Sequence, residues 1–150
     1  MNGVMKMTRA VLSVALAIAF MAGVSAQDKP NFAGKWKAAG SFNSWTITVE
    51  GSKMTVTMTV AGNSESTVYL LDGTPSTKTF DGPNGLMENV YTSTWEGDVL
   101  VTTIKTGFGT TIIEKRWIEP DGTMRVQNSL TVPGKPSPPP GPGLVLKKVG

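Results

Sequence analysis

The sequence predicts an all-β protein, an up-and-down antiparallel β-barrel or barrel-like sheet of eight to ten strands. Apolar and polar residues alternate with a period of two over most of the chain after Trp45, and long helical patterns are missing. Short turns, most of them containing glycine, separate the alternating runs roughly every ten residues. Turns this short cannot carry a parallel crossover, so neighbouring strands are expected to be antiparallel.

Residues 1–26 have the pattern of a signal peptide. A short basic segment precedes an uncharged apolar run at 11–24, which is too short to span a bilayer. Ser25 and Ala26 follow as small residues, so we expect cleavage before Gln27. The alanine-rich run is typical of bacterial export, which predicts a periplasmic or secreted protein with no membrane span after signal removal. An uncleaved N-terminal anchor is the alternative.

The remaining residues, 27–150, are expected to form a single β-barrel domain. The expected strands are the alternating runs 45–50, 53–60, 67–71, 89–95, 99–105, 110–118 and 124–132, with a short strand at 77–80. Gly51 is expected to supply positive φ in the first hairpin turn. Residues 133–143 are rich in proline and are expected to form an extended loop before a closing strand at 144–149. Docking of this loop in an aromatic groove is the alternative.

The chain has neither cysteine nor histidine, which excludes several chemistries. Ser-His-Asp and Cys-His nucleophiles, His/Cys zinc sites and haem held by His or Cys all need one of the two. Two of the 14 basic residues lie in the signal segment, so the rest is nearly balanced by the 11 acidic residues. The sequence has no cluster of basic residues of the kind that marks a nucleic-acid surface, so no nucleic-acid partner is expected. We expect no catalytic set, no metal and no cofactor.

Four motifs resemble, in their order along the chain, the calycin group of β-barrels. They are FAGKWK at 32–37, ITVEGSKMTVTM at 47–58, STWEGDVLV at 93–101 and KRWIEPDGTMRV at 115–126. The likeness is closest to the intracellular lipid-binding proteins and to small exported bacterial lipocalin-like proteins of unknown function. This resemblance implies a barrel with a ligand site in its interior, and it places Arg116 near the family's carboxylate-binding Arg, one residue further from the Asp-Gly turn.

The sequence also departs from the lipid-binding pattern. Only residues 37–44 separate Trp36 from Trp45, which leaves no room for the family's helical lid. The closing strand offers Lys147 and Lys148 where that family carries an Arg-x-Tyr pair.

The orientation of the expected strand at 110–118 determines whether charged or apolar side chains point into the barrel. Glu114 and Arg116 share one face, whereas Ile113 and Trp117 share the other. If the first face points inward, the two charges have to pair, hydrate or hold an anionic ligand. If the second points inward, Trp117 is core and the charges form a solvated pair. The cost of burying charge favours this second arrangement by a narrow margin.

The candidate ligand-binding residues combine polar and apolar anchors. They are Arg116, Glu114, Tyr69, Tyr91, Trp45, Met54 and Met58. The aromatic residues either line a pocket or close the barrel as core, and Trp36 is expected in the core. Methionine suits varied ligands and also simply fills gaps.

Three functions remain open. The first is an exported lipocalin-like binding protein for a small hydrophobic or amphipathic ligand, which requires a cavity lined by Met and Val with an inward Arg. The second is a cell-envelope structural or interaction protein with a closed core, no ligand and a solvent-facing Arg116. The third, an enzyme, is favoured least, because it requires a cleft that joins two carboxylates from different strands.

Overall fold

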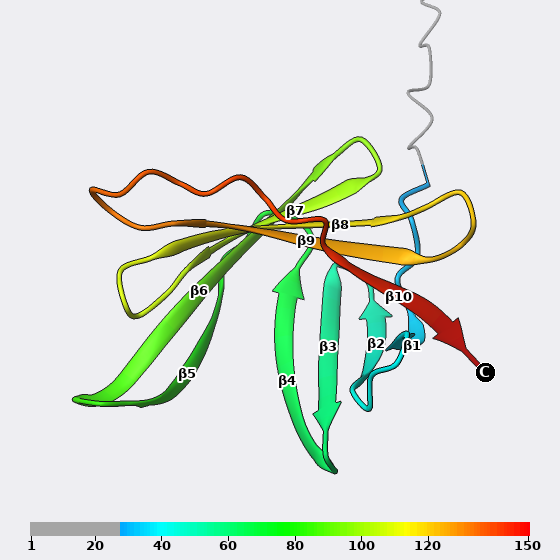
Figure 1. The fold of residues 1–150 in the computed structure, drawn as a ribbon, viewed down its shortest axis with the longest axis horizontal. Helices are drawn as coiled ribbons and strands as arrows, with labels where there is room; N and C mark the ends of the chain where they lie inside the picture. Colours follow the sequence, from blue (N-terminus) through cyan, green and yellow to red (C-terminus); the bar gives the residue numbers. More distant parts are fainter. Residues whose placement is uncertain (1–27) are drawn as a thin grey trace, which may run out of the picture.

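The part of the chain that the structure describes, residues 28–150, is built from strands and their connections (Figure 1). The structure is a computed structural model, and the predicted signal peptide at 1–26 lies outside the described residues. Within 28–150 no helix is long and apolar enough to cross a membrane. The strands are β1 (Gly34–Ala38), β2 (Ser44–Glu50), β3 (Lys53–Val60), β4 (Asn63–Leu70), β5 (Ser76–Gly82), β6 (Gly85–Glu96), β7 (Val99–Lys105), β8 (Thr111–Ile118), β9 (Met124–Thr131) and β10 (Leu144–Val149).

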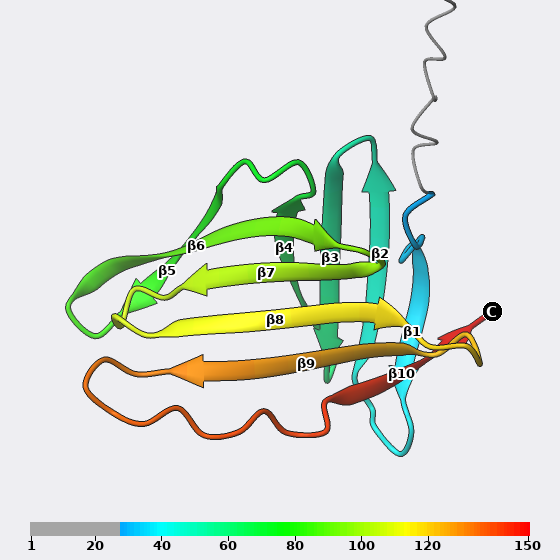
Figure 2. The same cartoon turned by 90° about the horizontal axis from the view of Figure 1, so that it is seen from above.

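All strand pairs are antiparallel, in the order β4-β3-β2-β1-β10-β9-β8-β7-β6-β5. Strand β10 joins the first and second halves of the chain, because Leu146 lies opposite Ala38 of β1 and opposite Met124 of β9. The two halves, β1–β4 and β5–β9, cross each other and face one another as a flattened, nearly closed barrel (Figures 1 and 2). The predicted fold class and the closing strand at 144–149 are confirmed.

Side chains, rather than a backbone ladder, bridge the one opening in the barrel, between β4 and β5. Ser76 Oγ donates a hydrogen bond to the carbonyl of Val68 at 2.6 Å. Lys78 Nζ reaches across to Glu65 Oε1 at 2.6 Å and to Thr67 Oγ1 at 3.3 Å. Polar contacts of this kind are weaker than a ladder of backbone hydrogen bonds, so this is the least firmly closed side of the barrel.

The apolar core fills one end of the barrel, which we call the base. Met54, Leu100 and Met124 each stand near the start of a strand that leaves a turn at this end, and at most 1% of each is exposed. Phe32 and Trp36, each 1% exposed, complete the base, and Trp36 Nε1 donates a hydrogen bond to the Phe32 carbonyl at 2.9 Å. Trp36 is therefore a core residue, as predicted.

The inward face of β8 carries Glu114 and Arg116, so the arrangement with Trp117 inside is wrong. Glu114 is 8% exposed and Arg116 4%, whereas Trp117 is only half-buried. The partner strand explains this orientation, because Arg116 lies opposite Leu100 and Glu114 opposite Thr102, both 1% exposed on β7. Residues directly opposite in a sheet share a face.

The connections agree with the sequence patterns. Gly51 has a φ of 61° in the β2–β3 turn, as predicted. The Pro-rich segment 133–143 runs beside β9 as an irregular loop (Figure 2). It is held there by Arg125 Nη1, which donates to the Pro142 carbonyl at 2.8 Å, and by Gln127 Nε2, which donates to the carbonyl of Gly141 at 2.7 Å.

We expect Trp36→Ala to lower the free energy of unfolding by about 3–5 kcal/mol, because it leaves a cavity in the base. Trp117→Ala changes a half-buried, outward-facing residue and should cost much less. Urea unfolding of both variants, followed by circular dichroism, measures the difference. Equal losses would contradict the assignment of the two tryptophans to opposite faces.

Candidate functional site

A cavity of about 320 Å³ opens between the two halves of the barrel, beyond the base. Residues from six strands contribute to its wall, so only the folded barrel assembles it. The lining residues are Trp45, Val56, Met58, Glu65, Thr67, Tyr69, Glu114, Arg116, Val126, Asn128, Leu144 and Leu146. Most of these side chains are apolar or aromatic, and the buried charged ones come from a single strand, β8.

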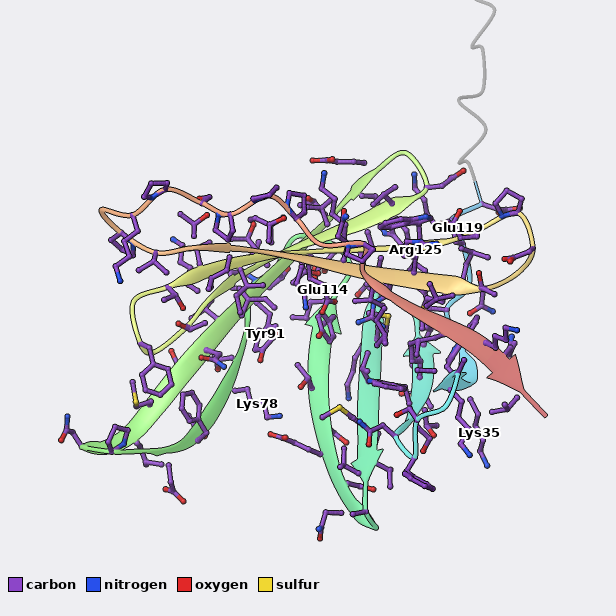
Figure 3. The ribbon with its side chains drawn as sticks, in the orientation of Figure 1. Lys35, Lys78, Tyr91, Glu114, Glu119 and Arg125 are labelled. Carbon is purple, nitrogen blue, oxygen red and sulfur yellow. The ribbon has the colours of Figure 1, made fainter. Side chains whose placement is uncertain are left out.

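The buried charges form one ion pair. Arg116 Nη2 donates to Glu114 Oε1 at 2.8 Å, and only 5% and 11% of the two side chains are exposed. The pairing is local, because residues two apart on a strand point to the same face. Figure 3 shows Glu114 pointing into the space between the two halves of the barrel. A buried charge is tolerated only when it is paired, so each residue depends on the other.

A tyrosine from the opposite half of the barrel, Tyr69, lies against this ion pair, and a second tyrosine packs on Tyr69. The guanidinium of Arg116 lies 5.6 Å from the ring centroid of Tyr69, a cation–π contact. Tyr69 meets Tyr91 edge to face, with ring centroids 5.5 Å apart. Tyr69 belongs to β4 and Tyr91 to β6, the neighbour of β5, so the aromatic contact joins the two halves of the barrel across the β4/β5 opening.

Burial and charge set the protonation states of this cluster. Burial raises the pKa of Tyr69 far above its usual range, and the Glu114 carboxylate raises it further, against the lowering effect of Arg116. Burial lowers the pKa of Arg116, but Glu114 and Tyr69 more than offset this, so the net direction is upward. Tyr69 therefore stays neutral and Arg116 stays charged at physiological pH.

One donor of the cluster is unused. Arg116 Nε is buried and has no hydrogen-bond partner among the residues that the structure describes. Arg116 Nη1 has a weak contact with the Met124 sulfur at 4.0 Å. A buried donor without an acceptor is costly, and such groups are commonly satisfied by a water or a ligand.

A second hollow of about 490 Å³ lies at the end of the barrel opposite the base, which we call the mouth, on the side of the β4/β5 opening. It shares Glu65 and Thr67 with the first cavity, so the two are neighbours. Its other lining residues are Lys78, Phe80, Asn89, Tyr91, Thr106 and Phe108. Figure 3 shows Tyr91 and Lys78 on this side of the interior.

The structure brings together most of the predicted site residues. Arg116, Glu114, Tyr69, Trp45 and Met58 all line the first cavity.

Two predicted site residues lie elsewhere. Tyr91 lines the second hollow. Met54 is 0% exposed and belongs to the core, so it does not reach either space. The sequence analysis missed Glu65 and Thr67, although they lie four and two residues before Tyr69 and therefore share its face.

The geometry separates the three functional hypotheses. A cavity lined by Met and Val with an inward Arg is present, as the binding hypothesis requires. A solvent-facing Arg116, which the closed-core hypothesis requires, is contradicted by its 4% exposure. Two carboxylates, Glu65 and Glu114, do line one cavity, but each is engaged by its own cation, Lys78 or Arg116.

Comparison with protein-family models and with curated proteins found no match. Several solved structures share the fold. Secretory abundant heat soluble protein 4 from Ramazzottius varieornatus is 15% identical, with a TM-score of 0.57 over 83% of this chain and 99% of that one. Another secretory abundant heat soluble protein from the same organism is also 15% identical, with a TM-score of 0.53 over 79% and 95%.

The third structure is a variant of the REP1-NXSQ fatty acid transporter. It is 16% identical, with a TM-score of 0.54 over 78% of this chain and 97% of that one. These likenesses show the fold alone. The chain shares the antiparallel β-barrel fold of these proteins, the kind of fold that the resemblance of its motifs implied.

The raised pKa of Tyr69 makes stability depend on pH in a defined direction. The unfolded chain releases this proton before the folded one, so the free energy of unfolding should fall as pH rises past the usual tyrosine pKa of about 10. Tyr69→Phe removes the proton and keeps the ring, and should lose less stability over the same window. Urea unfolding at neutral pH and near pH 11 measures this. An equal alkaline loss in both proteins would contradict the assignment.

Proposed function

We propose that the protein binds a small amphipathic molecule inside the barrel, with its apolar body along the cavity wall and its polar end at Arg116. The observation that carries this is the buried Arg116–Glu114 pair, which faces a cavity and keeps one guanidinium donor unused. A volume of about 320 Å³ lies at the lower end of the range for small-molecule sites.

The apolar wall supports a ligand with a hydrocarbon body. Trp45, Val56 and Met58 approach from one half of the barrel, and Val126 and Leu146 from β9 and β10. Burial of such a body removes apolar surface from water, while Met58 adapts to its shape. That one structural neighbour is a fatty acid transporter is in keeping with this kind of ligand.

The site of action follows from the N-terminal segment. We place the mature protein, from Gln27, in the bacterial periplasm or outside the cell, on the strength of the signal-peptide pattern at 1–26. An envelope location would suit a carrier of poorly soluble molecules between membranes.

Native mass spectrometry of the protein, expressed with its full N-terminal segment and purified from the periplasm without detergent, tests the proposal. We expect a chain that begins at Gln27 and carries a small molecule, which leaves on denaturation. A chain of uncleaved mass would contradict the proposed export. A folded protein that neither retains nor takes up any amphipath would contradict the binding function.

A cavity-filling variant locates the site. Val126→Trp adds bulk to the cavity wall and should weaken ligand binding by about tenfold or more, whereas Thr48→Trp changes an exposed, outward-facing residue and should leave it unchanged. Displacement of the neutral dye Nile red measures both variants. Equal binding by the two would place the ligand elsewhere.

A further inference from the structure

We infer that the cavity selects amphipaths with an uncharged hydroxyl head group and discriminates against carboxylates. This inference rests on the proposed function and names the ligand chemistry of the same site. It follows from the charges on the cavity wall, from the free atoms of the buried ion pair and from the surroundings of that pair.

Every charge on the cavity wall is compensated. The charged lining residues are Arg116, Glu114 and Glu65. Arg116 is neutralised by Glu114 at 2.8 Å, and Glu65 by Lys78 at 2.6 Å. A ligand therefore meets no net charge, which is the opposite of a site built to hold an anion.

A ligand carboxylate would be repelled by Glu114 at Arg116, the residue to which it would have to bind. To accept a hydrogen bond from Arg116, its oxygens have to approach the group that already holds the Glu114 carboxylate. Two carboxylates that share one guanidinium in a buried site repel each other. The anion would either displace Glu114 into an apolar wall or stay away from Arg116, and both outcomes weaken binding.

A hydroxyl group matches the hydrogen-bonding chemistry of both free positions of the pair, one a donor and one an acceptor. Arg116 Nε is a buried donor without a partner among the described residues. Arg116 engages Oε1 of Glu114, which leaves Oε2 as an acceptor. One hydroxyl oxygen accepts a hydrogen bond from Nε and donates its own proton to Oε2. An ammonium head could use only the acceptor, and it would face the charge of Arg116.

The surroundings keep this pair in place. Thr102, on the neighbouring strand, lies opposite Glu114 and is tied to Ser93 by a buried hydrogen bond of 2.8 Å. Tyr69 covers the guanidinium. The buried pair is thus fixed from two strands besides its own, and a ligand has to adapt to it.

The test compares n-decanol, decanoate and decylamine, which share one chain and differ in head group. Binding to the full mature protein is measured by displacement of Nile red at neutral pH. We expect n-decanol to bind at least about tenfold more tightly than either charged ligand. Decanoate should bind more tightly as the pH falls through the pKa of its own carboxyl group, because the protonated acid is neutral.

Glu114→Gln removes the compensating charge and should largely abolish the preference for n-decanol over decanoate. Decanoate should gain about tenfold in affinity, and n-decanol should change little. Glu96→Gln is the matched control, because it makes the same change in charge at an exposed residue at the end of β6. If Glu114→Gln does not fold, the wild-type comparison and its pH dependence decide the question.

The outcomes separate this inference from the proposed function. Decanoate or decylamine bound as tightly as n-decanol by the wild-type protein would overturn the selectivity and leave the binding function standing. No binding of any of the three to a folded protein would overturn both. Glu114→Gln that folds and keeps the wild-type preference would show that Glu114 does not set the selectivity.

Discussion

When a meander of strands closes into a barrel, one face of each strand turns inward, and the polar groups on that face have to be satisfied inside. The rest of this structure depends on how β8 meets this constraint. Its inward face holds Arg116 and Glu114, which neutralise each other at 2.8 Å. Arg116 and Glu114 lie two residues apart on β8, so neither needs a charged partner from another strand. The opposite half of the barrel can therefore supply apolar and aromatic walls.

The two ends of the barrel differ in packing: the base is tightly filled, and the cavity of the proposed binding function lies beyond it. The base is filled by residues such as Met54, Leu100 and Trp36, at most 1% exposed, and it supplies the apolar burial that holds a fold without disulfides together. The opposite end stays loosely filled, and it is also where Lys78 bridges β4 and β5 in place of a backbone ladder. Regions with few buried apolar contacts open most easily, so the mouth is the part of the barrel best suited to admit a ligand.

Much of the fold can be predicted from the sequence, because alternation and glycine turns are local signals. The runs 99–105 and 144–149 match β7 and β10 residue for residue. Strand β4 begins four residues before the predicted start, at Asn63, because its first half is polar and resembles a turn. Thr57 Oγ1 and Thr59 Oγ1 bond to serines of this polar half across the ladder, which no local pattern reveals.

The interior of the site is harder to predict, because it depends on contacts between distant residues. The two faces of β8 carry apolar residues in similar number, so alternation alone cannot orient the strand. What decides it is the register with β7, together with the cover that Tyr69 of β4 gives to Arg116. Met54 and Met58 illustrate the same limit: they share one face of β3, yet only Met58 reaches the cavity.

A fold of this class does not determine the chemistry of its ligand, because function lies in the side chains that the interior presents. In this barrel an inward Arg by itself would indicate an anionic ligand. Glu114, two residues away on the same face, changes that conclusion, because the guanidinium already has its counter-charge. What remains for a ligand is a donor, Arg116 Nε, and the second oxygen of Glu114. The hydrogen-bonding pattern of the pair, rather than its charge, is then what a ligand has to match.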